Sequence, residues 1–403
     1  MTQEALMKRL LIILLSLLLP AASAEGVTLR TVSCFAGEDA AAGAYVELLH
    51  VYEEQTGNRV EDDSATSDEG WKTRVLSDFA VGNEPDVLFF FACSADSAPI
   101  LRMMVPISEI NAAYPGLNLE TSDILREADG QIYAIPARPY YEGLFVNTDL
   151  FERYGVPLPE TWDQLEQAVA AFNAQGIVPI AASLSDIPHY LAECAVLACA
   201  TPAEYAARPA GLGDVPQSWL DGMALIRRLY ALGAFPEDAL HTSEAVTSQM
   251  FRDKQAAMQF DGSWFANTIP ESGMDTTRVL PVPQAGAGGA VIGGVSMGFY
   301  LTRRAWDDPL RRDAAVGLLA WLTAPENAAR LGAEQTSGAL RESALALMDH
   351  ATAVLGPLQD DMNKDARAAW LLDCVPAVAE GRMTPEACWE SVMALSPFDS
   401  DGE

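Results

Sequence analysis

Apolar and polar positions near the N-terminus alternate between the period of a strand and the period of a helix. The run 87–91 is apolar at every position, which is typical of a strand buried on both faces. Between 41 and 52 the apolar residues recur at helical spacing, and Gly57 ends that helix. The predicted order is strand, helix, strand, helix, strand, over 27–35, 41–52, 59–62, 71–79 and 87–91. This order predicts a parallel sheet with candidate binding residues in the loops after its strands.

The segment 130–150 joins two strand-like runs. The first, 131–136, stops at a proline, and the second, 143–147, stays apolar until Asn147. The residues between the runs place two aromatic rings and two charges at a change of direction; they are Arg138, Pro139, Tyr140, Tyr141 and Glu142. We expect the chain to pass here from one domain into another, with this insert at the floor of a cleft.

The region after this segment is mainly helical. Capping boxes are predicted at Thr161 and Thr201. The run 256–260 is strand-like, and a turn separates it from Trp264. Further strands are predicted over 279–282 and 299–302, and helices continue from 310 to about 395.

The length and charge of the chain limit the number of domains and the kinds of partner that we expect. At roughly 150 residues per domain, 403 residues predict two or three domains. The formal net charge is −31, and the acidic residues are scattered along the chain. A surface of this charge repels phosphate backbones and anionic lipids, so nucleic acid is not an expected partner.

The first 24 residues have the composition of an export signal. Lys8 and Arg9 precede an apolar run over 10–19, and Ala22 and Ala24 match a small-residue cleavage site. A run of about ten residues is too short to span a bilayer, which needs about twenty. We expect a soluble exported protein, periplasmic or extracellular, that begins near Glu25 and has no lipid-bearing cysteine at the cleavage site.

The six cysteines and four histidines show no metal-binding or redox spacing, so no metal and no cofactor is expected. An even number of cysteines in an exported chain is compatible with disulfides as well as with free buried thiols. The acidic residues Asp62, Asp63, Asp68 and Glu69 are close in sequence but do not form a calcium-loop pattern.

Three stretches carry a resemblance to a known family. They are GQIYAIPARPYYEGLFVNTDLFERYGVPLPETWDQL, FRDKQAAMQFDGSW, and IGGVSMGFYLTRRAW continuing to AAVGLLAWLTAPENAARLG. In order and spacing they resemble the family 1 extracellular solute-binding proteins of ATP-driven sugar importers, which include maltose-binding protein. The resemblance covers nearly all of the chain after the signal.

The resemblance implies a two-lobed α/β fold of the type II periplasmic-binding-protein kind. Each lobe is then a mostly parallel sheet flanked by helices, and crossing hinge segments join the lobes. We expect the N-terminal lobe over 25–137 and 279–310, and the C-terminal lobe over 138–278 and 311–403. The implied function is capture of a mono- or oligosaccharide by hinge closure and delivery to an ABC transporter permease, by a monomeric protein without enzymatic activity.

The resemblance also implies ligand contacts, carried over position by position. They are Glu38 and Asp39 after the first strand, Asp96 near the loop after the third, Tyr140 in the crossing segment, Trp264 as a ring that stacks on a pyranose, Gly293 and Gly294 where backbone approaches the ligand, and Arg341 in a late loop. The chain departs from maltose-binding protein by having Phe90 and Phe91 where that protein has a tryptophan.

The residue chemistry points to the same class of ligand. A sugar presents apolar C–H faces and a rim of hydroxyls, so its site needs aromatic rings together with hydrogen-bond acceptors. Trp264, Tyr140 and Tyr141 supply the rings. The carboxylates of Glu38, Asp39, Asp96 and Asp261 supply the acceptors.

Three alternatives stay open. An acidic cleft with aromatic rings also suits a polyamine, and the adjacent Tyr140 and Tyr141 resemble the phenolate pair of ferric-ion binders. An exported carbohydrate-active enzyme is less favoured. The pattern G-x-S-x-G over 294–298 needs a strand before it and a helix after it, whereas here a strand is predicted after it.

Overall fold

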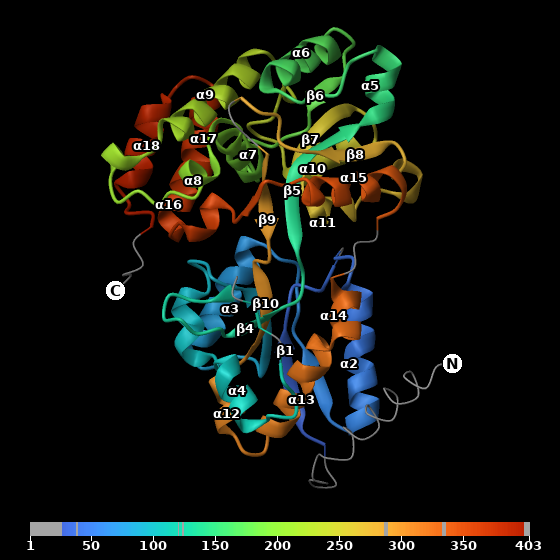
Figure 1. Cartoon of the computed structure of the whole chain (residues 1–403), viewed down its shortest axis with the longest axis vertical. Helices are drawn as coiled ribbons and strands as arrows, with labels where there is room; N and C mark the ends of the chain where they lie inside the picture. The colour runs from blue at the N-terminus through green and yellow to red at the C-terminus, as the bar shows by residue number, and fades with distance from the viewer. Residues whose placement is uncertain are drawn as a thin grey trace.

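A computed structural model describes residues 26–37, 39–119, 121–122, 125–285, 289–332 and 336–398. The expected signal over 1–24 and the candidate ligand residue Glu38 lie outside the described residues. The described chain forms two lobes stacked along the longest axis of the molecule. Strands β5, β9 and β10 run roughly parallel to this axis near the place where the lobes meet (Figure 1).

The strands are β1 (Thr28–Val32), β2 (Arg59–Asp62), β3 (Val87–Phe91), β4 (Ala134–Pro136), β5 (Tyr140–Asn147), β6 (Val178–Ile180), β7 (Ala256–Gly262), β8 (Thr277–Leu280), β9 (Ala290–Gly294), β10 (Met297–Leu301) and β11 (Ala353–Leu355). The helices are α2 (Ala42–Thr56), α3 (Glu69–Ala80), α4 (Ile107–Ala113), α5 (Thr148–Tyr154), α6 (Trp162–Asn173), α7 (His189–Cys199), α8 (Pro202–Tyr205), α9 (Gln217–Ala231), α10 (Glu244–Arg252), α11 (Ser263–Ala266), α12 (Arg303–Asp307), α13 (Arg312–Thr323), α14 (Pro325–Leu331), α15 (Gly338–Asp349), α16 (Lys364–Ala368), α17 (Val375–Ala379) and α18 (Pro385–Met393).

The first lobe is built on a sheet in the order β2-β1-β3-β10-β4. Strand β1 pairs in parallel with β2 and β3, as the alternation of strand and helix near the N-terminus predicted. Strand β10 pairs antiparallel with both β3 and β4. The second lobe is built on a sheet in the order β11-β9-β5-β7-β6, with β8 also paired to β5.

The predicted α/β two-lobed fold class is confirmed, but the expectation of mostly parallel sheets is only partly met. Strand β5 pairs antiparallel with β7, β8 and β9, while β6–β7 and β9–β11 are the parallel pairs of its sheet. Strands β5 and β10 each arrive from the other lobe. A strand that enters a sheet in this way needs no helical crossover, so it is free to run antiparallel to its neighbours.

The segment 130–150 does cross between the lobes, because β4 belongs to the first sheet and β5 to the second. The second crossing, from β9 to β10, runs back alongside it. Gly293 permits this close pairing, since a Cβ at that position would lie 2.7 Å from the carbonyl oxygen of Tyr140. Gly294, with a φ of +132°, takes a backbone conformation that favours glycine.

Strand pairing and the hydrophobic cores assign some elements to a different lobe from the one predicted from the sequence. Strand β9 and the end of β8, expected in the N-terminal lobe, pair with β5 in the second sheet. Helices α13 and α14, expected in the C-terminal lobe, contribute Leu318, Leu319 and Leu331 to the core of the first lobe. We therefore propose that the lobes exchange chain near 137–140, 294–297 and 331–338.

Each lobe has its own core. In the first lobe, α2, α13 and α14 cover the sheet, and the ring of Phe89 contacts those of Phe35 and Phe299 in the core. In the second, α7 and α9 pack on one side of the sheet, where Trp219 and Trp370 both contact Trp389. The two predicted capping boxes, at Thr161 and Thr201, are confirmed and begin α6 and α8.

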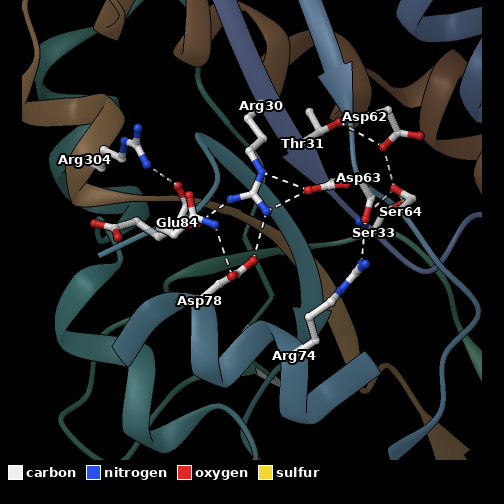
Figure 2. A network of polar contacts seen from close by, with 11 residues as sticks. Arg30, Thr31, Ser33, Asp62, Asp63, Ser64, Arg74, Asp78, Glu84 and Arg304 are labelled. Atoms are coloured by element: carbon white, nitrogen blue, oxygen red, sulfur yellow. Dashed lines mark hydrogen bonds and ion pairs between the residues drawn. The ribbon is translucent and has the colours of Figure 1, made fainter. Parts of the chain in front are cut away.

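The acidic residues at 62–63 belong to a network on the first lobe (Figure 2). Asp63 accepts from Arg30 Nη2 at 2.8 Å, and Asp62 accepts from the Thr31 hydroxyl at 3.1 Å. Arg30 also pairs with Asp78 at 2.9 Å. These carboxylates therefore accept hydrogen bonds from arginine and hydroxyl donors within the protein, and the bonds connect β1 to β2 and to α3.

The six cysteines all fall within the described residues and are unpaired there. Cys374 and Cys388 are close enough for the Cys374 thiol to contact the carbonyl oxygen of Cys388 at 3.8 Å. In the part of the chain that the structure describes, none of the helices has the length and apolar character needed to cross a bilayer.

Candidate functional site

A row of aromatic rings in the second lobe joins α11, β5 and α7. Trp264, in the short helix α11, is 40% exposed. Its ring centroid is 6.0 Å from that of Tyr140 on β5 and 5.2 Å from that of Tyr190 on α7. His189 continues the row, 4.0 Å from Tyr190. An exposed indole supported by two buried or half-buried phenols is a suitable surface for the apolar face of a sugar.

Local sequence explains how Trp264 is presented. Strand β7 ends at Gly262 and α11 starts at once, so the indole folds back over the end of its own strand. A Cβ at Gly262 would collide with the indole ring of Trp264. Glycine at this position is therefore what allows the ring to lie where it does.

Buried carboxyl groups border the aromatic row. Glu142 on β5 and Glu193 on α7 are at most 1% exposed, and in each the Oε2 atom has no hydrogen-bond partner among the described residues. Burial raises the pKa of Glu142 well above its usual range, and the nearby Glu193 and Asp360 contribute to the same shift. Within the described chain no arginine or lysine pairs with either carboxyl, so both are favoured in the protonated form.

Asp261, at the end of β7, was predicted as a ligand contact and lies beside Trp264. Its Oδ2 accepts from Gln259 Nε2 at 2.7 Å, and its Oδ1 accepts from the Gly262 amide at 2.7 Å. Burial, with a smaller contribution from the neighbouring Glu244, raises the pKa of Asp261 from 3.8 to about 7 against the effect of these hydrogen bonds. The carboxyl therefore changes charge near neutral pH.

Replacing Asp261 with asparagine should alter the pH dependence of stability. The folded protein keeps the Asp261 proton up to about pH 7, whereas the unfolded chain releases it near pH 3.8, so unfolding free energy falls as pH rises between these values. The asparagine side chain cannot ionise. We expect D261N to be close to wild type at pH 4, or lower by about 1 kcal/mol for a lost hydrogen bond, and more stable at pH 8 by an amount on the order of 4 kcal/mol. Denaturant unfolding at pH 4, 6 and 8 measures this; parallel curves for the two proteins would refute it.

Asp96, the predicted contact after the third strand, joins the two lobes instead of standing free. Both of its oxygens accept from Arg367 on α16, at 3.1 and 3.0 Å, and Lys72 on α3 lies 3.3 Å away. The Ala95 amide donates to the carbonyl oxygen of Asp360 at 3.0 Å. Asp96 and Arg367 are 9% and 7% exposed, so this is a buried ion pair across the interlobe boundary.

The aromatic row lies close to this ion pair. Burial, together with the positive charges of Lys72 and Arg367, lowers the pKa of His189 to about 3. The His189 ring is therefore neutral, and it places the second lobe's aromatic row beside a charged group of the first lobe.

Asp39 lies in the loop after β1 and is tied to the first crossing segment. Its two oxygens accept from Arg138, at 2.8 and 2.9 Å, and Arg138 also donates to the carbonyl oxygen of Leu331. The guanidinium lies 5.0 Å from the ring centroid of Phe35. Arg138 thus anchors the start of the crossing segment to the first lobe through Asp39.

The remaining predicted residues lie elsewhere. Tyr141 is buried in the core that packs on the opposite face of β5 from Tyr140, with Phe145 and Phe265. Arg341 is exposed on α15. Gly293 and Gly294 pair with Tyr141 and Tyr140 on the crossing strands.

The structure thus brings together Trp264, Tyr140 and Asp261 from the predicted set and adds residues that the sequence analysis did not select. The additions are Tyr190, Glu193, Gln259, Glu244 and Arg367, together with Glu142, which the sequence placed in the crossing segment but not among the ligand contacts. The sequence contains a signal that could have identified three of these residues. A charged or amide side chain inside an apolar strand or helix is unusual, and this describes Glu142 in β5, Glu193 in α7 and Gln259 in β7.

Comparison with known proteins now settles the family. Residues 35–329 match the sequence model of the bacterial extracellular solute-binding protein. The chain belongs to this family. The resemblance seen in three sequence stretches is therefore confirmed, and proteins of this family bind solutes outside the cytoplasm. Among curated proteins, the search found no significant match.

Solved structures share the fold of this solute-binding protein over nearly its whole length. A chitin oligosaccharide binding protein is 19% identical with a TM-score of 0.81, over 94% of this chain and 100% of that one. The GacH receptor of Streptomyces glaucescens GLA.O, described in complex with acarbose, is 16% identical with a TM-score of 0.71, over 92% and 97%. RafE in complex with raffinose is 17% identical with a TM-score of 0.68, over 92% and 98%.

Proposed function

We propose that this solute-binding protein is exported, captures a mono- or oligosaccharide between its lobes, and delivers it to the permease of an ABC transporter. The observation that carries the proposal is the exposed indole of Trp264, in contact with the rings of Tyr140 and Tyr190 and bordered by hydrogen-bond acceptors. The sugar-binding structural neighbours support the same class of ligand. The protein does no chemistry on the sugar.

Hinge closure is the proposed mechanism. Ligand contacts from both lobes stabilise the closed arrangement, and the permease recognises that arrangement. The crossing segments near 137–140 and 294–297 would bend, while the Asp96–Arg367 pair would form as the lobes meet. Trp264, Tyr140 and Asp261 are retained as sugar contacts, and Tyr190 is added to them.

The geometry disfavours the ferric-ion alternative. Adjacent residues of a strand point to opposite faces, and Tyr140 and Tyr141 contact different clusters on the two sides of β5. Two phenolates so arranged cannot both bind one ion. The G-x-S-x-G pattern runs from the last residue of β9 into β10, so a strand follows the serine where a nucleophile elbow requires a helix.

A thermal-shift screen of the purified protein against sugars, polyamines and ferric citrate tests the proposed class. A ligand at about 100 times its dissociation constant adds about 2.7 kcal/mol to stability, which raises the melting temperature of a chain this size by a few degrees. We expect such a shift with a series of related sugars. A shift with polyamines or iron alone would overturn the carbohydrate assignment.

A further inference from the structure

A small cavity lies behind the aromatic row, between β7, α10 and the start of α7. Its volume is about 20 Å³, enough for one group the size of a water molecule. Tyr190 belongs both to the cavity wall and to the aromatic row, so the cavity is adjacent to the surface on which a sugar would stack. Figure 1 shows α7, α10 and α11 gathered around β7 in the second lobe.

Three side chains in the cavity wall present acceptors of hydrogen bonds. Asp261 and Glu244 present carboxyl groups to it, and Gln259 presents its amide. Gln259 Nε2 donates to Ser248 Oγ and to Asp261 Oδ2, both at 2.7 Å. This leaves Gln259 Oε1, in a side chain that is 3% exposed, without a hydrogen-bond partner in the described chain.

Two of the hydroxyl groups in the wall, those of Ser183 and Thr247, already donate their protons within the protein. Ser183 Oγ donates to the carbonyl oxygen of Thr242 at 2.7 Å, and Thr247 Oγ1 donates to that of Glu244 at 3.0 Å. No lysine, arginine or histidine is among the lining residues. The site is therefore complementary to a small group that donates hydrogen bonds and carries positive charge, which describes an ammonium.

A metal ion suits the site less well. Within the described residues, no group of three or more histidine, cysteine, aspartate or glutamate side chains is placed to hold one. The indole and phenol rings beside the cavity fit an organic ligand whose cationic nitrogen is attached to a ring.

We infer that the sugar carries an unacetylated primary amine, held as an ammonium by Asp261, Glu244 and Gln259 while its ring stacks on Trp264. This inference rests on the proposed carbohydrate function and specifies the ligand within it. An acetylated amine lacks the charge and exceeds the size of the cavity, so N-acetyl sugars should not place that group there.

Calorimetric titration with matched pairs of sugars tests the inference. The pairs are glucosamine with glucose, galactosamine with galactose, mannosamine with mannose, and the β-1,4-linked glucosamine disaccharide with cellobiose. At least one amino sugar should bind about 10- to 100-fold more tightly than its neutral counterpart. The N-acetyl counterpart should not share that gain.

Two variants locate the effect. D261N and E244Q should each lose most of the preference for the amine, while E54Q, which removes an exposed carboxylate on α2 of the first lobe, should keep it. Thermal unfolding of D261N and E244Q confirms that both are folded. A preference that persists in both variants would overturn the assignment to this cavity.

The remaining outcomes separate the inference from the function on which it rests. Neutral sugars that bind as tightly as their amino counterparts would overturn the inference and leave carbohydrate capture standing. Binding of putrescine or another alkylamine, with no sugar bound from any pair, would overturn both.

Discussion

Replacing Trp264 with alanine is expected to weaken sugar binding by at least about 30-fold, which corresponds to about 2 kcal/mol. The indole is the most exposed ring of the aromatic row, and it contacts both Tyr140 and Tyr190. Alanine leaves the sugar without its apolar surface. Because the ring is 40% exposed, the fold should lose little stability, and calorimetry together with thermal unfolding separates the two effects.

Two controls make this result specific. Trp264→Phe keeps an aromatic face and should retain most of the affinity, whereas Leu345→Ala removes an exposed apolar side chain on α15 and should change nothing. An affinity unchanged in W264A would remove Trp264 from the site and with it the main support for a carbohydrate ligand.

Replacing Arg367 with methionine is expected to shift the protein toward an open arrangement of its lobes. The change leaves Asp96 buried with Lys72 as its one remaining cation among the described contacts. Breaking one side of a buried ion pair costs about 3–5 kcal/mol, and here that free energy is lost only when the lobes are together. Small-angle scattering should show a larger radius of gyration, and sugar affinity should fall at least about tenfold.

The chain offers a matched control within one lobe. Arg303 also makes a bidentate pair with Glu109, at 2.8 and 2.6 Å, but this pair lies inside the first lobe and is about one third exposed. R303M should therefore reduce stability by no more than about 1 kcal/mol and leave the radius of gyration and the affinity unchanged. If R303M and R367M behave alike, the Asp96–Arg367 pair does not control closure.

Much of the fold follows from short-range patterns in the sequence. The apolar run at 87–91 became β3, the capping boxes at Thr161 and Thr201 begin α6 and α8, and the interrupted strand at 130–150 does pass between the lobes. Each of these depends on residues a few positions apart, where periodicity and local hydrogen bonding decide the conformation.

The parts that sequence reasoning missed depend on distant pairings. Strand β9 ends in two glycines and shows no alternation, so its pairing with β5 could not be seen. Arg367 lies 271 residues from Asp96, and nothing near either residue indicates the partner. The loop position of Asp96 predicts a ligand contact but not its pairing with Arg367.

In the candidate site, too, residues within a local motif could be predicted from the sequence, whereas residues brought together by packing could not. Trp264 was identifiable because the motif around it is local, and Asp261 lies within that motif. Tyr190 and Glu244 become part of the site only because α7 and α10 pack against β7, a contact that no local pattern predicts. A polar residue inside an apolar segment, such as Gln259, is the one sequence signal that would have extended the prediction.

Hydrogen exchange measured by mass spectrometry, with and without the sugar that gives the largest thermal shift, tests the central claim most directly. Binding between the lobes predicts slower exchange in peptides from both lobes: those containing Tyr140, Tyr190 and Trp264 in the second, and the 93–97 loop in the first. Protection confined to one lobe, or located away from the aromatic row, would contradict capture of a sugar at the interlobe boundary.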